Sequence, residues 1–102
     1  MSTETTGGAK NNQAALRRTV MIINQRGLHA RAAAKFVKLA GEFDAEVAVE
    51  RNGTAVSGMS IMGLMMLAAA TGCEIEIAVT GPQAASALAA LSKLVSDGFD
   101  EP

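Results

Sequence analysis

The chain has 102 residues and a mass of 10.5 kDa, which is the size of one ordinary domain and excludes a multidomain enzyme. Apolar residues make up 49% of the chain, so a packed core can form without disulfides. The single cysteine excludes a disulfide within the chain, and with only one histidine beside it a Cys/His zinc site is excluded too. The net charge of −1 conceals an asymmetry, because seven cations and no acid lie between residues 5 and 41, whereas nine acids and two cations follow.

The first part of the chain predicts a tail, a strand and a helix. Residues 1–16 show no sustained apolar period, so we expect a flexible tail there and the domain over residues 17–102. The β-branched segment 18–23 predicts a strand, which the turn-forming residues 24–27 end. A helix is expected from about Ala30, with Ala33, Phe36, Val37 and Ala40 on its apolar face and Arg31, Lys35, Lys38 and Glu42 on its charged face.

The second part predicts a hairpin, a helix, a strand and a last helix. Residues 45–50 alternate apolar with polar side chains, and Asn52-Gly53 is a strong hairpin signal, so a partner strand is expected over residues 54–57. Ser60 is expected to cap a helix over residues 61–70. Residues 74–79 alternate again as a strand, and Pro82 is expected in the first turn of a last helix.

The order β-α-β-β-α-β-α predicts an α+β fold. Tight hairpins, alternating strands and amphipathic helices indicate an open-faced two-layer β-sandwich. In this fold, three helices cover one face of a four-stranded antiparallel sheet.

His29 is the first candidate for chemistry. It lies directly before the predicted helix, where backbone N–H groups and the positive end of the helix dipole point outward. Arg31 can hold phosphate oxygens, and Lys35 and Lys38 extend the positive field. A neutral histidine can accept a phosphoryl group, and nearby cations stabilise the product. The alternative is that His29 only caps or packs at the helix start.

The second unusual feature is a Met-rich patch, which we define as Met59, Ile61, Met62 and Met65. The segment 59–67 is apolar all around the predicted helix, so one side must be exposed unless the helix is buried on every side. Clustered methionines suit adaptable binding, which favours an interaction surface. The apolar stretch 59–70 is too short to span a bilayer. Cys73 is expected to be a small buried or half-buried apolar residue.

Several motifs together resemble one family. Gly27-Leu28-His29-Ala30-Arg31, Lys35-Phe36-Val37, Asn52-Gly53 and Ser60-Ile61-Met62-Gly63 are similar to HPr, the histidine-containing phosphocarrier of the bacterial phosphoenolpyruvate-dependent phosphotransferase system. The similarity covers about residues 18–98. It implies that His29 takes a phosphoryl group on Nδ1 from phospho-enzyme I and passes it to an EIIA-type acceptor. Arg31 would steady the phosphate. Ser60 would match the regulatory serine that an ATP-dependent HPr kinase/phosphorylase modifies in many members.

We expect partners to dock on both of the first two helices. The residues concerned are Ala30, Lys35 and Lys38 together with the Met-rich patch. On this interpretation the protein is a cytoplasmic monomer and a phosphoryl carrier, not a turnover enzyme, and it needs no cofactor or metal.

Two features depart from the family pattern, and two other functions remain as alternatives. Ala32 stands where the family usually has proline, and the N-terminal tail is unusually long, so a nitrogen-related or regulatory branch is as plausible as sugar uptake. The first alternative is a regulatory binding module that acts through the Met-rich patch and phosphorylation of Ser60. The second, a nucleic-acid-binding domain, is disfavoured because the chain has no Trp or Tyr for base stacking. We likewise expect no membrane association.

Overall fold

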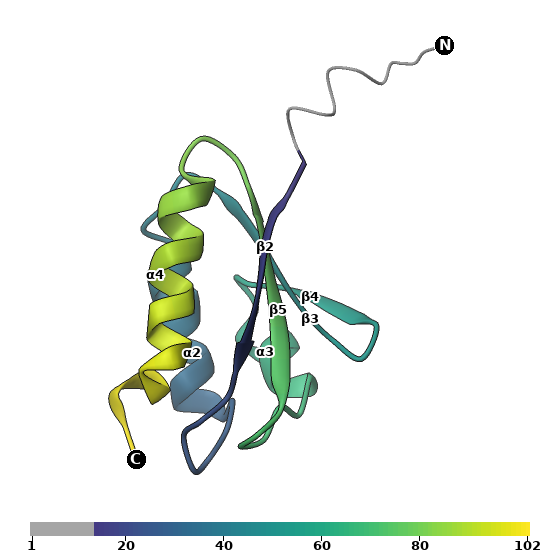
Figure 1. Ribbon diagram of the computed structural model, residues 1–102, viewed down its shortest axis with the longest axis vertical. Coiled ribbons are helices and arrows are strands. Elements are labelled where there is room, and N and C mark those ends of the chain that lie inside the picture. The colour runs from purple at the N-terminus through teal and green to yellow at the C-terminus, as the bar shows by residue number, and fades with distance from the viewer. Residues whose placement is uncertain (1–13) are drawn as a thin grey trace.

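The computed structural model describes residues 14–102, and Figure 1 shows its layers. One antiparallel sheet has the strand order β2-β5-β3-β4, and its strands are β2 (Leu16–Met21), β3 (Glu46–Arg51), β4 (Thr54–Ser57) and β5 (Glu74–Thr80). The helices are α2 (Ala30–Ala40), α3 (Ile61–Met66) and α4 (Ala84–Ser96), and a short turn, η1 (Gly98–Asp100), follows α4. The predicted open-faced two-layer sandwich and its element order are confirmed.

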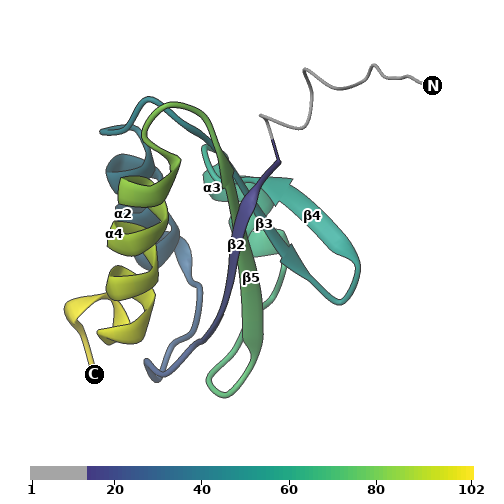
Figure 2. The ribbon, with the colours of Figure 1, turned by 45° about the horizontal axis from the view of Figure 1, so that its top comes forward.

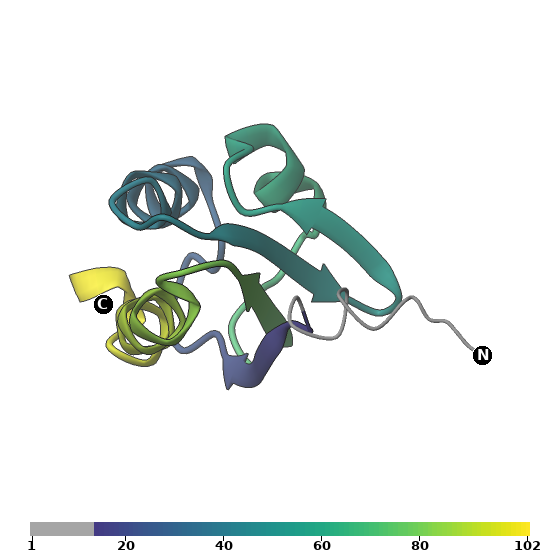
Figure 3. The same cartoon turned by 90° about the horizontal axis from the view of Figure 1, so that it is seen from above.

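The core lies between the sheet and the helices. Ile75, Ile77 and Val79 alternate along β5 toward the helix layer and are buried there. Phe36 on α2 meets them from the other side and is also fully buried. Each such side chain contributes roughly 1.5–3 kcal/mol through the hydrophobic effect. In the view from above, α2 is the middle helix, with α3 and α4 as its two neighbours (Figure 3).

The β3–β4 hairpin has the turn that its sequence predicts. Asn52 and Gly53 have φ values of 51° and 81°, and Arg51 pairs with Thr54 across the turn. Two successive positive φ values are typical of the type I′ turn, whose twist matches that of the strands.

The helix expected over residues 61–70 is shorter than predicted, because α3 ends at Met66. Leu67 is its C-cap residue, and Ala68 has a φ of 53°. The backbone of the next residues is held by other parts of the chain. Arg51 Nη1 donates to the Leu67 carbonyl over 2.9 Å, and the Leu28 N–H donates to the Ala69 carbonyl over 2.9 Å. These tertiary bonds override the helix preference of three alanines.

Other boundaries differ from the sequence-based expectation as well, among them the end of the first strand, which lies at Met21 and not at residue 23. Leu16, assigned to the tail, is the first residue of β2, while the rest of the expected tail up to residue 13 lies outside the described residues. Pro82 lies before α4 and not in its first turn, because Gln83 is the N-cap residue. Gln83 is tied to the loop at Asp44, whose N–H donates to Gln83 Oε1 over 2.6 Å. This contact fixes residues 81–83 as a turn.

The C-terminus returns to the loop that leads into α2. Figure 2 shows the yellow final residues leaving α4 at the end of the molecule where β2 turns toward α2. The Gln25 N–H donates to the Pro102 carbonyl over 2.9 Å. The last residues of the chain therefore lie beside residues 24–29.

Candidate functional site

His29 is the N-cap residue of α2, as its position in the sequence suggests. Its backbone is extended, and its carbonyl accepts from the Ala33 N–H over 2.8 Å. Its ring Nδ1 accepts from the Arg31 N–H, 3.3 Å away. Just before it, Gly27 turns the chain with a φ of 67°, and the side chain of Leu28 is buried. The ring is thus held at a defined place at the N-terminus of the helix.

The other ring nitrogen of His29 contacts the end of the chain. Nε2 lies 2.8 Å from Glu101 Oε1, and the two side chains are 17% and 14% exposed. An ionised carboxylate can only accept, so Nε2 carries the proton. Nδ1 accepts from Arg31 and so carries none. The hydrogen-bond pattern therefore assigns a neutral ring whose lone pair is on Nδ1.

Glu101 is itself held by a buried amide. Asn24 is 1% exposed, and its Nδ2 donates to Glu101 Oε1 over 3.0 Å and to the Gly27 carbonyl over 2.8 Å. The hydrogen bond with His29, followed by that from Asn24, holds the pKa of Glu101 below its ordinary range. The carboxylate is consequently ionised at neutral pH.

The cations expected on α2 lie in different environments. Arg31 and Lys38 are exposed, as predicted. Lys35, expected on the exposed face, is half-buried because its Nζ donates to the Phe99 carbonyl over 2.6 Å. Lys35 therefore holds the C-terminal segment and is less available to a partner than the sequence indicated. Ala30, the first residue of α2, is exposed.

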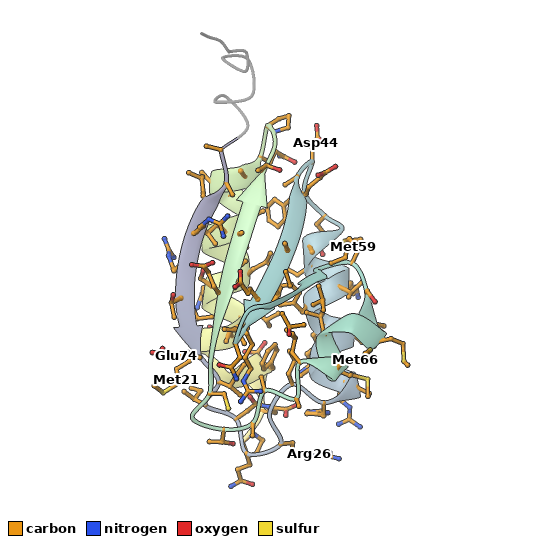
Figure 4. All side chains as sticks on the ribbon, turned by 90° about the vertical axis from the view of Figure 1, so that its right-hand side faces the viewer. Met21, Arg26, Asp44, Met59, Met66 and Glu74 are labelled. Carbon is orange, nitrogen blue, oxygen red and sulfur yellow. The ribbon has the colours of Figure 1, made fainter. Side chains whose placement is uncertain are left out.

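The Met-rich patch lies on α3 and, through Met59, just before it, and α3 packs beside α2. Met62 is 69% exposed, and Met59, Ile61 and Met65 are also exposed, so the expectation of a helix with one uncovered side is confirmed. The structure adds Met66, which is 77% exposed and lies four residues after Met62. Figure 4 shows Met59 and Met66 on the same side of the molecule, to the right of the sheet in that view.

Ser60 is the N-cap residue of α3, as predicted. Its Oγ accepts from the Gly63 N–H over 2.9 Å, and the residue is half-buried between two patch residues in the sequence. Cys73 is half-buried, as expected, and its Sγ lies 3.2 Å from Arg51 Nη2.

The space around the site is shallow. A hollow of about 230 Å³ beside His29 is lined by Arg26, Leu28 and residues 68–70. A larger hollow, of about 580 Å³, contains residues of β5 such as Glu74 and Glu76 and none of the candidate site. Within residues 14–102, no group of His, Cys, Asp and Glu side chains is arranged to hold a metal ion. Every helix in this range is too short or too polar to cross a membrane.

Sequence reasoning missed Asn24 and Glu101. Glu101 is 72 residues from His29, and the contact depends on the path of the last five residues. No local pattern of residue types gives that path. The only signal in the sequence is an acidic residue, Glu101, after Asp97-Gly98-Phe99-Asp100. An acidic residue at this place does not point specifically to a contact with His29.

Comparisons with known proteins agree on the family. A family model described as the phosphorylation site of the HPr component of the phosphotransferase system matches residues 16–97. The chain is 49% identical over 86 residues to the phosphocarrier protein HPr of Neisseria meningitidis, covering 84% of this chain and 97% of that one. It is 45% identical over 87 residues to the phosphocarrier protein NPr of Escherichia coli, with the same coverage.

Solved structures agree as well. An HPr structure from Thermoanaerobacter tengcongensis has a TM-score of 0.81 and 36% identity, and covers 85% of this chain and 98% of that one. The phosphocarrier protein HPr of Bacillus anthracis has a TM-score of 0.77 and 41% identity, with 80% and 98% covered. The chain therefore belongs to the HPr family of phosphocarrier proteins of the phosphotransferase system.

Proposed function

We propose that this protein accepts a phosphoryl group on Nδ1 of His29 from phospho-enzyme I and passes it to a histidine of an EIIA-type acceptor. The observation that carries the proposal is the state of the His29 ring. Nε2 holds the proton and faces Glu101, so the free lone pair of the ring is on Nδ1. Nδ1 lies at the N-terminus of α2, where it accepts from the Arg31 N–H. This is the nitrogen that can act as a nucleophile, and it lies where an anion is stabilised.

The transfer exchanges one bond to phosphorus for another. The Nδ1 lone pair forms the bond to phosphorus while the bond between phosphorus and the donor atom breaks, and the donor atom keeps that pair. The Arg31 N–H, which now bonds Nδ1, is freed to donate to a phosphoryl oxygen. The exposed Arg31 guanidinium can reach the same oxygens, and the positive end of α2 stabilises the added charge. Transfer to the acceptor reverses these steps.

The direct test is phosphorylation of the full chain. It should become labelled when incubated with enzyme I and phosphoenolpyruvate that carries a labelled phosphoryl group. The label should be labile to acid and stable to base, as expected for a phosphoramidate on histidine. A chain that stays unlabelled with an enzyme I that labels another HPr would contradict the proposal.

Docking is proposed to use α2 and α3 together. Lys38 on α2 supplies exposed charge, and the Met-rich patch on the adjacent α3 supplies exposed apolar area. Charges at the rim of an interface mainly raise the association rate, whereas buried apolar contacts slow dissociation.

Two substitutions should separate these contributions. Met62→Glu is expected to raise the dissociation rate constant for enzyme I about tenfold, because it places a charge in the centre of the apolar contact. Lys38→Glu is expected to lower the association rate constant and to flatten its dependence on salt. Stopped-flow measurements at several salt concentrations give both constants. If both substitutions change the same constant, this division of roles is wrong.

A second candidate role is regulation through the Met-rich patch and Ser60. The large exposed fraction of the patch and the place of Ser60 between Met59 and Ile61 favour it. A phosphoserine at Ser60 would put a charge of about −1.5 to −2 beside Ile61 and Met62. A partner that recognises Lys38 through acidic groups would then bind less well.

Ser60→Asp is therefore expected to fold with a melting temperature at or above that of the parent and to accept a phosphoryl group at least about tenfold more slowly. Ser60→Asn is the matched control, since asparagine caps as well as aspartate but carries no charge. It should accept at the parental rate. Equal rates for the two variants would leave Ser60 as a helix cap without a regulatory role.

A further inference from the structure

The segment that brings Glu101 to His29 has an unusual backbone. Gly98, Phe99 and Asp100 have successive φ values of 68°, 57° and 60°. Aromatic residues avoid this region, and even aspartate adopts it as a single residue, so Phe99 and Asp100 persist there in succession only when the surroundings fix them. Phe99 is fully buried, and the Glu101 N–H donates to the Gly98 carbonyl over 3.1 Å. A left-handed turn thus follows α4 and leads the chain to Glu101.

Two contacts from other elements secure the same segment. Lys35 Nζ donates to the Phe99 carbonyl over 2.6 Å, and the Gln25 N–H donates to the Pro102 carbonyl over 2.9 Å. Glu101 lies between these two anchors. Its Oε1 therefore reaches His29 from a defined direction and not as the end of a free tail.

The geometry at Oε1 identifies its partners. Asn24 Nδ2 has two acceptors, the Gly27 carbonyl and Glu101 Oε1, which fixes the orientation of its amide. The same Oε1 lies 2.8 Å from His29 Nε2. One carboxylate oxygen thus accepts from both Asn24 and His29, and the loop before α2 is joined to the end of the chain.

We propose that Glu101 is a positioning residue for phosphoryl transfer. It holds His29 in the form protonated on Nε2, and it offsets the positive charge that the ring gains when Nδ1 takes the phosphoryl group. The proposal rests on the phosphocarrier function proposed above. Before transfer the ring is neutral. Once the Nδ1 pair is in the bond to phosphorus, the ring still has its Nε2–H and is an imidazolium, which the carboxylate 2.8 Å away stabilises.

The same arrangement serves the reverse step. When the phosphoryl group leaves for an acceptor, the electron pair returns to Nδ1 and the ring becomes neutral again. The proton on Nε2 stays in the bond to Glu101 throughout, so the ring does not have to change tautomer between acceptance and delivery.

Two variants separate the charge of Glu101 from its role as an anchor. Both hydrogen bonds go to Oε1, and an amide oxygen can also accept both, so Glu101→Gln keeps the contacts and removes only the charge. Glu101→Ala removes the contacts as well as the charge. Asp100→Asn is the matched control, because it removes a neighbouring exposed charge and asparagine tolerates a positive φ.

The experiment combines ring spectroscopy with kinetics on the full chain. Ring ¹⁵N shifts of unphosphorylated protein report the tautomer, and the Gln25 amide signal reports whether the C-terminus is docked. In the parent and in Glu101→Gln, the ring should carry its proton on Nε2, whereas Glu101→Ala should show a mixture of tautomers. With phospho-enzyme I, Glu101→Gln should lower kcat about tenfold with little change in KM, because charged hydrogen bonds are about twice as strong as neutral ones. Asp100→Asn should react like the parent.

Two results would overturn the proposal. One is a parental ring that carries its proton on Nδ1. The other is a Glu101→Gln protein with a docked C-terminus and the parental kcat, which would make Glu101 an anchor only. Failure of the proposed function would give a different result. The parent itself would then take no phosphoryl group, while its ring spectrum would still show Nε2 protonated and bonded to Glu101.

Discussion

His29→Ala is expected to abolish acceptance of an acid-labile phosphoryl group from phospho-enzyme I while leaving the fold intact. The substitution removes Nδ1, the proposed phosphoryl acceptor. It also removes the acceptor of the Arg31 N–H and the hydrogen bond to Glu101, but it removes no side chain of the packed core. Loss of a helix N-cap costs about 1 kcal/mol, which a folded domain of this size tolerates. Thermal unfolding and labelling of the same sample measure both effects.

His29→Asn is the matched control for the loss of the cap. Its side-chain oxygen can accept from the Arg31 N–H, so its melting temperature should lie closer to that of the parent. It has no ring nitrogen and should also remain unlabelled. Acid-labile label on either variant would show that another residue accepts the phosphoryl group.

The sequence predicts this fold well wherever the signal is local. Alternation along β5 and the Asn52-Gly53 pair fix the strands and the hairpin, because both depend on neighbouring residues. The prediction is wrong after Met66, where the Leu-Ala-Ala-Ala segment favours a helix by itself. Its carbonyls instead bond Arg51 and the Leu28 N–H, and such partners cannot be found from local propensity.

The candidate site divides in the same way. The places of His29 and Ser60 as N-cap residues follow from their positions before helical patterns, and both are confirmed. Glu101 reaches His29 only through a left-handed turn at Phe99 and Asp100, and an aromatic residue such as Phe99 does not predict a positive φ. The half-burial of Lys35 has the same origin, because its acceptor is the carbonyl of Phe99. Both features are tertiary consequences of how α4 ends.

Gly27→Ala is expected to destabilise the protein by roughly 2–5 kcal/mol, through backbone strain of about 1–2 kcal/mol and a steric clash of about 1–3 kcal/mol. Gly27 has a φ of 67°, and a Cβ added there would lie 2.5 Å from the Ala69 carbonyl oxygen and 3.0 Å from the Ala70 Cα. These atoms are backbone and cannot rotate away. The Ala69 carbonyl also accepts from the Leu28 N–H over 2.9 Å, so a shift of the loop breaks that bond.

Gly53→Ala separates the strain from the clash. Gly53 has a φ of 81°, but a Cβ there would meet nothing within 4 Å, so only the strain of about 1–2 kcal/mol applies. Urea unfolding of both variants measures the difference. Because Gly27 lies two residues before His29, the loop shift should also pull the ring away from Glu101 and slow phosphoryl acceptance, which Gly53→Ala should not. Equal stability losses in the two variants would show that the segment at Ala69 yields to the added Cβ, and the His29 ring should then keep its bond to Glu101.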